Sequence, residues 1–393
     1  MNDNKEETTE ISINFHDLGL SDNLLKAVSE AGYETPTQIQ EKAIPAILMN
    51  KDILGCAQTG TGKTASFVLP LLDILEEGRA RARMPRCVII APTRELAAQV
   101  AQNFETYGKY HQLNMALLIG GVAFGEQDQA LTRGVDVLIA TPGRLIDQIE
   151  RGKIILGDVQ ILIIDEADRM LDMGFIPDVE KLIQLMPKNR QTLLFSATMP
   201  PEIRKLADRF LTNPREVTVA PPSSASKNID QGLVMLSDAR HKRKTLFKML
   251  DQNEFTNLLI FCNRKRDVET LRQSLRQSGY AAAALHGDMD QYKRLECLNQ
   301  FKQGEASILV CSDVAARGLD IPSVSHVYNY DVPTHAEDYV HRIGRTGRAG
   351  RSGIARTLAS PLENKYIEAI EAMLGMKIPL STGGDASTGG NVV

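Results

Sequence analysis

Two polar segments follow apolar runs in the first half of the chain. Residues 57–64 read Ala-Gln-Thr-Gly-Thr-Gly-Lys-Thr, and residues 161–168 read Ile-Leu-Ile-Ile-Asp-Glu-Ala-Asp. The first segment follows the phosphate-loop pattern, except that Ala57 stands at the usual position of glycine. The second places adjacent carboxylates at the end of an aliphatic run, and unpaired carboxylates are costly in an apolar core. Together the segments predict the two halves of an ATP-hydrolysis site with magnesium.

The phosphate loop predicts contacts with nucleotide phosphates. The loop leaves an expected strand and opens a helix at about Gly62, so its backbone N–H groups would face phosphate oxygens. Lys63 is expected to reach the β- and γ-phosphates, and the Thr64 hydroxyl is expected to hold magnesium. The candidate nucleotide-binding residues of the loop are Ala57, Gln58, Thr59, Gly60, Thr61, Gly62, Lys63 and Thr64.

The two adjacent acids have distinct expected roles. They end an apolar run, and ligands of open parallel sheets bind at the carboxyl ends of the strands. Asp165 is predicted to be the magnesium carboxylate, and Glu166 is placed to orient or deprotonate the attacking water. An acid pair at a solvated helix start is the alternative for these residues alone, and the phosphate loop argues against it.

Short apolar runs alternate with helix-patterned segments along most of the chain. This alternation predicts an α/β fold in which parallel sheets carry helices on both faces. The pattern restarts after residues 219–228, where prolines and serines break both periodicities. The expected strands are residues 53–57, 88–91, 117–120, 137–140, 161–164 and 192–195, followed by 258–262, 282–285, 308–311, 326–330 and 354–358.

These breaks predict a two-domain organisation, because 393 residues exceed one ordinary core. We expect a disordered N-terminus at 1–12, domains at 13–218 and 229–378 joined by a linker at 219–228, and a disordered tail at 379–393. Composition is that of a soluble globular protein, with 43% hydrophobic and 24% charged residues. The net charge of -4 argues against a generally basic surface, so nucleic acid would need a local basic one.

Membrane and secretion signals are not apparent in the sequence. No apolar stretch approaches the length of a membrane span, and the polar start has no signal-peptide core. We therefore expect a cytoplasmic protein. The five cysteines include no Cys-x-x-Cys pair, and four lie in apolar runs, so they are expected to be small core residues rather than metal ligands or disulfides.

Further motifs extend these two segments into a family resemblance. They include Gly32 to Gln40, Pro92 to Ala97, Thr141 to Arg144, Ser196 to Thr198, Ser312 to Asp320 and His341 to Arg348, in that order. The chain resembles the DEAD-box RNA helicases from Phe15 to about Ala359. The resemblance implies two tandem RecA-like domains that face each other across a cleft.

The resemblance also implies how the nucleotide is read and hydrolysed. Gln38 would hydrogen-bond the adenine edge, since a carboxamide both donates and accepts, while Tyr33 would stack on the ring with Phe15 behind it. Arg345 and Arg348 resemble the arginine fingers, which contribute roughly 10³ to 10⁵ in rate. The remaining implied roles are ribose and interdomain contact for Asp320 and coupling between ATP and RNA for Asp168, Ser196, Thr198 and His341.

A further set of positions matches residues that hold the RNA backbone in the family. They are Arg94, Gly121, Thr141, Gly143 and Arg144 in the first domain and Arg294, Ser312 and Gly318 in the second. Such contacts carry no base information, so binding should be salt-sensitive and independent of sequence. Two other basic groups, Arg79 to Arg86 and His241 to Lys244, are interpreted as solvated surface, with an RNA contact as the alternative.

The function predicted on this basis is an ATP-dependent, magnesium-using RNA helicase. It would separate short duplexes locally and couple domain closure to ATP hydrolysis, acting as a monomer in ribosome assembly or RNA decay. One rival is a protein that only clamps RNA with ATP, but the expected hydrolytic residues are all present. A second rival is a DNA translocase of the same superfamily, which Asp168 and the Gln38 motif disfavour.

Overall fold

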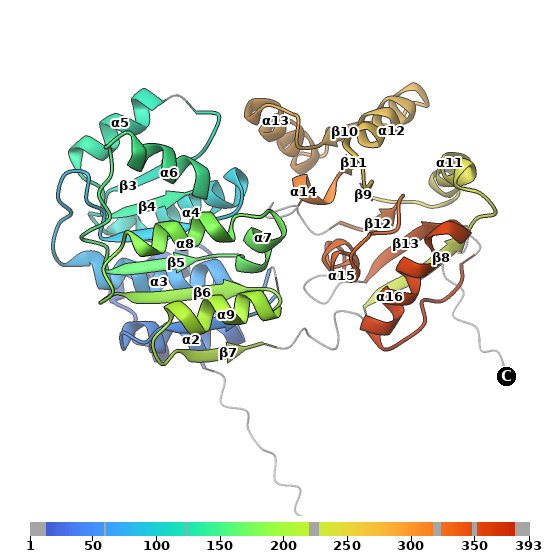
Figure 1. The fold of residues 1–393 in the computed structure, drawn as a ribbon. Coiled ribbons are helices and arrows are strands. Elements are labelled where there is room, and N and C mark those ends of the chain that lie inside the picture. Colours follow the sequence, from blue (N-terminus) through green and yellow to red (C-terminus); the bar gives the residue numbers. More distant parts are fainter. Residues whose placement is uncertain are drawn as a thin grey trace, which may run out of the picture. The chain divides into compact units, whose positions relative to one another are not determined.

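The computed structural model describes residues 13–58, 60–122, 124–219, 228–316, 324–347 and 352–381 (Figure 1). The chain divides into two compact units, Met1–Pro221 and Pro222–Val393. The predicted N-terminus, most of the linker and residues 382–393 of the predicted tail lie outside the described residues. Among the described helices, none combines the length and apolarity needed to cross a membrane.

The first unit is built on a parallel sheet of seven strands in the order β3-β4-β2-β5-β6-β1-β7. Strands and helices alternate along the chain, as the sequence pattern predicts. The strands are β1 (Ile53–Cys56), β2 (Cys87–Ile90), β3 (Met115–Leu118), β4 (Val137–Ala140), β5 (Ile161–Ile164), β6 (Gln191–Ser196) and β7 (Arg215–Thr218). The helices are η1 (Phe15–Leu18), α1 (Asp22–Glu30), α2 (Gln38–Leu48), α3 (Lys63–Glu76), α4 (Arg94–Tyr107), η2 (Gly108–Tyr110), α5 (Phe124–Arg133), α6 (Pro142–Glu150), α7 (Ala167–Asp172), α8 (Ile176–Gln184) and α9 (Pro201–Phe210).

Helices cover both faces of this sheet (Figure 1). Successive strand residues point to opposite faces. On β5, Ile161 and Ile163 accordingly pack with residues of α1 to α4, whereas Leu162 and Ile164 pack with residues of α5 to α9. Because both faces are buried, the strand reads as a continuous aliphatic run. The same packing explains why the apolar runs could be recognised as strands in the sequence.

The second unit is a parallel sheet of six strands in the order β10-β11-β9-β12-β13-β8. It also has helices packed on its strands through separate apolar clusters. The strands are β8 (Ile229–Met235), β9 (Leu258–Phe261), β10 (Ala282–Leu285), β11 (Ile308–Cys311), β12 (His326–Asn329) and β13 (Gly353–Ala359). The helices are η3 (Ala239–His241), α11 (Lys242–Gln252), α12 (Lys265–Gln277), α13 (Gln291–Lys302), α14 (Asp313–Ala316), α15 (Ala336–Ile343), η4 (Pro361–Glu363) and α16 (Asn364–Leu374).

Two strands were not expected from the sequence. They are the edge strands β7 and β8, which mix polar and apolar residues and flank the proline- and serine-rich break. The predicted strand at 117–120 lies two residues too late, because β3 ends at Leu118 and Gly121 turns the chain with a φ of 82°.

The predicted tail also begins too early. Leu233 of β8 donates its N–H to Pro379 O at 2.7 Å, and Ser381 N–H donates to Leu233 O at 2.8 Å. The backbone of residues 379–381 therefore pairs with β8 and belongs to the second unit.

Candidate active site

The carboxyl edge of the first sheet collects the predicted residues in two groups. Since all pairs are parallel, every strand ends at the same edge, and strand order decides which side chains become neighbours. The adjacent strands β5, β6 and β1 lead to Asp165, Ser196 and the phosphate loop. The other half of the edge, β3, β4 and β2, leads to Gly121, Thr141 and Arg94. The sheet order thus separates the predicted ATP residues from the predicted RNA residues.

The phosphate loop runs from β1 to the N-terminus of α3. Gly60 and Gly62 have φ values of 86° and 87°, the left-handed region that favours glycine. The Thr61 hydroxyl donates to Gln58 O at 2.7 Å and closes the turn. The predicted contact residue Thr59 lies outside the described residues. Lys63 begins the helix, so the loop and the helix N-terminus form one anion-binding element.

Gln40 supports this loop and had no role in the sequence analysis. Its side chain is only 3% exposed, and its Nε2 donates to Gly62 O at 3.2 Å while its Oε1 accepts from Thr37 N–H at 2.8 Å. A β-carbon at Gly62 would lie 2.5 Å from Gln40 Nε2. The Thr-x-x-Gln spacing of a helix-capping box was the available signal. Gln38, the predicted adenine reader, is exposed at the first position of α2.

Two buried charges next to the loop fit a magnesium-bound nucleotide. Lys63 Nζ is buried and, within the described part of the chain, has no hydrogen-bond partner. Asp165 is 2% exposed, and its pKa is raised to about 7, mainly by burial and in part by Glu166, while Lys63 opposes the shift. An ammonium without an acceptor suits a phosphate, and a desolvated carboxylate suits a cation. Lys63 would thus hold phosphate, and Asp165 with Thr64 would hold magnesium.

Asp165→Asn is expected to raise the Tm of the ligand-free chain more at pH 8 than at pH 5. The folded-state pKa lies near 7 and above the ordinary value of 3.8, so above pH 7 the folded state carries the full cost of the buried charge. As pH falls from 7 toward 3.8, proton uptake removes that cost and the benefit of the substitution shrinks. Differential scanning calorimetry with nucleotide and magnesium withheld measures the effect.

Asp168→Asn is the matched control for this measurement. Its carboxylate accepts several hydrogen bonds, so an amide there should lower the Tm at both pH values. Equal Tm changes at pH 5 and pH 8 for Asp165→Asn would contradict the account.

Glu166 is held in a strained backbone conformation. Its φ of 53° and ψ of 56° place it in the left-handed region, which is uncommon for a residue with a β-carbon and costs of order 1 kcal/mol or more. The carboxylate forms a buried ion pair with Arg169, one turn along α7. Arg169 was missed in the sequence analysis, where only the acids were considered. The pair fixes the direction of the carboxylate predicted to act on water.

Asp168 joins α7 to the end of β6. Its Oδ2 accepts from Ala197 N–H at 3.1 Å, Thr198 N–H at 2.8 Å and the Thr198 hydroxyl at 3.0 Å. Its own N–H donates to Ser196 Oγ at 3.1 Å. Three of the four residues predicted to couple ATP to RNA are therefore linked, because Asp168 bonds both Ser196 and Thr198. Their coupling role stays a prediction.

The predicted RNA residues of the first unit form a second neighbourhood. The Arg94 guanidinium lies against the backbone turn at Gly120 and Gly121, where a β-carbon at Gly121 would be 2.5 Å from Arg94 Nη1. Arg144 donates to Val122 O at 3.0 Å and lies over the ring of Phe124 at 4.2 Å. Thr141 and Gly143 lie at the start of α6, where Thr141 is the N-cap. A helix start, glycines and arginines at one edge suit phosphate contacts.

The second unit repeats this division along its sheet. Arg294 lies on α13 after β10, and Ser312 follows β11, where its N–H donates to Leu285 O at 3.2 Å. His341 lies on α15, and the buried Arg345 follows that helix. Gly318, Asp320 and Arg348 lie outside the described residues. The predicted RNA residues thus follow β10 and β11, and the described predicted finger follows β12.

Arg342 links several elements of the second unit and lies three residues before the predicted arginine finger Arg345. It is 1% exposed and forms a two-pronged ion pair with Asp313, with contacts of 2.6 Å from both Nε and Nη2. It also donates to Asn263 Oδ1 at 2.8 Å and to Asp331 O at 2.7 Å. The guanidinium therefore joins α15, α14 and the end of β9. No role was predicted for Arg342, because its partners lie far apart in the sequence and form no recognisable spacing of residue types.

Two basic residues interpreted as solvated surface are buried instead. Arg86 is 6% exposed and bonds Asp136 Oδ1, Leu75 O and Glu77 O at 2.7, 2.7 and 2.6 Å. Lys242 is 4% exposed and pairs with Asp331 and Glu363. A run of basic residues in the sequence does not show which of them will be buried and bonded to acceptor groups.

The two aromatic residues predicted at the adenine site differ in exposure. Phe15 is 5% exposed in the core of the first unit, whereas Tyr33 is 50% exposed and lies 6.2 Å from the ring of Tyr107. Of the two, Tyr33 therefore has the accessible ring.

Comparison with known proteins agrees with this architecture. Residues 37–206 match the family model described as DEAD/DEAH box helicase, and residues 241–350 match the helicase conserved C-terminal domain. The chain is 44% identical to the DEAD-box ATP-dependent RNA helicase CshA of Bacillus subtilis over 92% of this chain and 72% of that protein. It is also 44% identical to the ATP-dependent RNA helicase DeaD of Mycobacterium tuberculosis, over 91% of this chain and 62% of that protein.

Solved structures show the same two-unit fold. Dbp5 of S. cerevisiae bound to RNA and ADP BeF3 is 30% identical, with a TM-score of 0.81 and coverage of 93% of this chain and 95% of that one. A DEAD box protein from Methanococcus jannaschii is 40% identical, with a TM-score of 0.55 and coverage of 94% and 99%.

The fold and site define a phosphate-loop enzyme of two RecA-like units. The chain belongs to the DEAD-box family of ATP-dependent RNA helicases. The predicted family, fold and enzyme class are confirmed.

Proposed function

We propose that this protein hydrolyses ATP when RNA is bound and uses the cycle to separate short RNA duplexes locally. The observation that carries the proposal is the buried pair of Lys63 Nζ, without a hydrogen-bond partner among the described residues, and Asp165, whose pKa is raised by burial. Buried charges at the carboxyl edge of a parallel sheet suit the binding of a nucleotide and its cation. A buried charge without a bound partner lowers the stability of the fold.

The nucleotide half of the edge would carry the chemistry. The loop N–H groups and Lys63 hold the phosphates, Gln38 selects adenine, and magnesium held by Thr64 and Asp165 would neutralise charge on the phosphates. Glu166, oriented by Arg169, positions the water. The fingers Arg345 and Arg348 would come from the second unit, so hydrolysis would require the two units to close.

RNA binding would use the other half of the edge in each unit. Arg94, Gly121, Thr141, Gly143 and Arg144 would hold one stretch of backbone, and Arg294, Ser312 and Gly318 would hold the next. Asp168 follows β5, the strand of the ATP half that lies next to β2 of the RNA half, and it bonds Ser196 and Thr198, so these residues are suited to report RNA binding to the ATP site. His341 would complete this link in the second unit, and Asp320 would make the ribose and interdomain contact. ATP and RNA would then each favour the closed state.

The proposed setting is the cytoplasm, where the protein would act as a monomer on ribosomal precursors or RNA undergoing decay. Binding would follow the phosphate backbone, so it would weaken steeply with salt and tolerate any sequence.

An ATPase assay with RNA, DNA or no nucleic acid tests the proposal. We expect phosphate release to rise several-fold or more with single-stranded RNA and to stay near the basal rate with DNA of the same sequence. Equal stimulation by DNA would support a translocase instead. ATP-dependent RNA binding without stimulated hydrolysis would support an RNA clamp, and stimulated hydrolysis without separation of a short labelled duplex would contradict local unwinding.

A further inference from the structure

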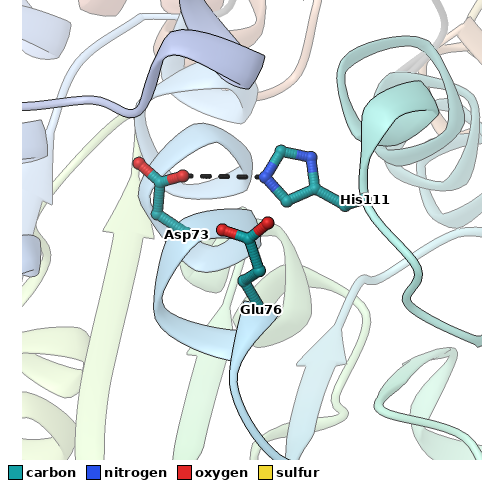
Figure 2. A group of neighbouring side chains, drawn as sticks. All are labelled: Asp73, Glu76 and His111. Atoms are coloured by element: carbon teal, nitrogen blue, oxygen red, sulfur yellow. Dashed lines mark ion pairs between the residues drawn. The ribbon is translucent and has the colours of Figure 1, made fainter.

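A second polar cluster lies in the first unit, away from the phosphate loop. It consists of Asp73 and Glu76 on α3 and His111 just after η2, and Figure 2 shows the three side chains turned toward one another. One nitrogen or oxygen of each residue lies within 4.8 Å of the other two. Asp73 follows Lys63 by ten helical residues, or about 15 Å at 1.5 Å per residue, so the cluster is separate from the phosphate-binding end of the helix.

His111 is the residue of the cluster that most strongly indicates a ligand. Its side chain is 0% exposed, yet within the described part of the chain neither Nδ1 nor Nε2 has a hydrogen-bond partner. A buried polar group left without a hydrogen-bond partner destabilises the folded state. Nε2 faces Asp73 Oδ1 at 3.6 Å, beyond hydrogen-bond distance (Figure 2).

The spacing is that of two ligands on one ion. Zinc binds imidazole nitrogen and carboxylate oxygen at about 2.0–2.2 Å, so two ligands at a tetrahedral angle lie about 3.4 Å apart. The observed 3.6 Å between His111 Nε2 and Asp73 Oδ1 is close to this separation. An ion between these atoms would give the imidazole a partner and leave a coordination position for water.

The aspartate is already oriented from behind. Asp73 Oδ2 accepts from Ser21 N–H at 2.9 Å, and Asp73 Oδ1 accepts from the Ser21 hydroxyl at 2.5 Å. Ser21 is the N-cap of α1, so the carboxylate is held by a fixed element. Hydrogen bonds of this kind commonly orient metal-binding carboxylates. Glu76 is exposed and reaches the cluster from one turn along α3.

We propose that Asp73, Glu76 and His111 bind one zinc ion. An imidazole among the ligands disfavours magnesium and calcium, which take oxygen ligands, and the absence of thiolate from the cluster disfavours copper(I). One nitrogen and two carboxylates suit zinc with a water completing the tetrahedron. The bound ion would tie the C-terminal end of α3 and the start of α1 to the segment between η2 and β3.

The test is zinc binding to the full-length protein after dialysis against a chelator. Zinc is titrated in competition with a chromophoric chelator, with excess magnesium present to occupy the phosphate site. We expect one equivalent of zinc to bind the wild type, and Glu76→Gln and His111→Gln each to weaken that equivalent at least tenfold. Glu77→Gln is the matched control, because Glu77 is an exposed neighbouring acid outside the cluster.

One further measurement separates loss of the zinc site from loss of the fold. Glu76 is exposed, so its variant should fold normally even if the buried His111 variant does not. Cobalt replacing zinc should give a visible absorption band of tetrahedral intensity in wild type and Glu77→Gln and lose it in Glu76→Gln. Equal zinc affinity in wild type and Glu76→Gln, or wild-type binding only at millimolar zinc, would overturn the proposal.

Discussion

Glu166→Gln is expected to reduce RNA-stimulated ATP hydrolysis by about 10²–10⁴-fold, the range for loss of a positioned acid–base group. The amide keeps nearly the same shape and can still accept from Arg169, whose guanidinium now pairs with the carboxylate. ATP and RNA should therefore still bind, and the complex formed with both should persist because it does not turn over. Single-turnover phosphate release and RNA dissociation rates measure the two effects.

Glu202→Gln provides the matched control. Glu202 is an exposed acid in the first turn of α9 on the same unit, and no catalytic or binding role is assigned to it, so its variant should behave as wild type. Turnover at the wild-type rate in Glu166→Gln would show that another group positions the water.

Arg345→Ala is expected to lower RNA-stimulated hydrolysis by roughly 10³–10⁵, the contribution of an arginine finger. The affinity of the full-length protein for ATP in the absence of RNA should change little, because the phosphate loop lies in the first unit. Steady-state hydrolysis and fluorescent-nucleotide binding test the two halves of this expectation.

Two variants separate the finger from a structural role. Arg345→Lys keeps the charge but loses the planar fork, so its activity should stay far below wild type. Arg266→Ala removes an 81%-exposed arginine of the same unit and should leave hydrolysis unchanged. A loss of ATP affinity in Arg345→Ala that matches its loss of hydrolysis would argue against a role specific to the transition state.

The fold could be predicted well because buried parallel strands are recognisable in sequence. The runs at 137–140, 161–164, 282–285 and 308–311 coincide with β4, β5, β10 and β11. The edge strands β7 and β8 could not be recognised, because their sequences mix polar and apolar residues and form no continuous aliphatic run.

The motif residues of the candidate site could be recognised in the sequence, but the residues whose hydrogen bonds support them could not. Lys63, Asp165 and Asp168 stand in recognisable spacings, and the structure places them around the ends of β1, β5 and β6. Gln40 and Arg342 act through buried hydrogen bonds to partners distant in sequence. Such partners are brought together only by tertiary packing, so no local sequence pattern predicts these contacts.

The register of β6 constrains how this protein family can vary in length. Cys56 pairs with Ser196 at the ends of β1 and β6. Side chains alternate between the faces of a strand, so a one-residue insertion in β6 would turn Ser196 toward the opposite layer and break its bond to Asp168. Compensation would require a second change in β1 and β5 together. Insertions and deletions should therefore be rare in this central strand. They should concentrate at the amino ends of the strands, at the edge of the sheet opposite the motifs.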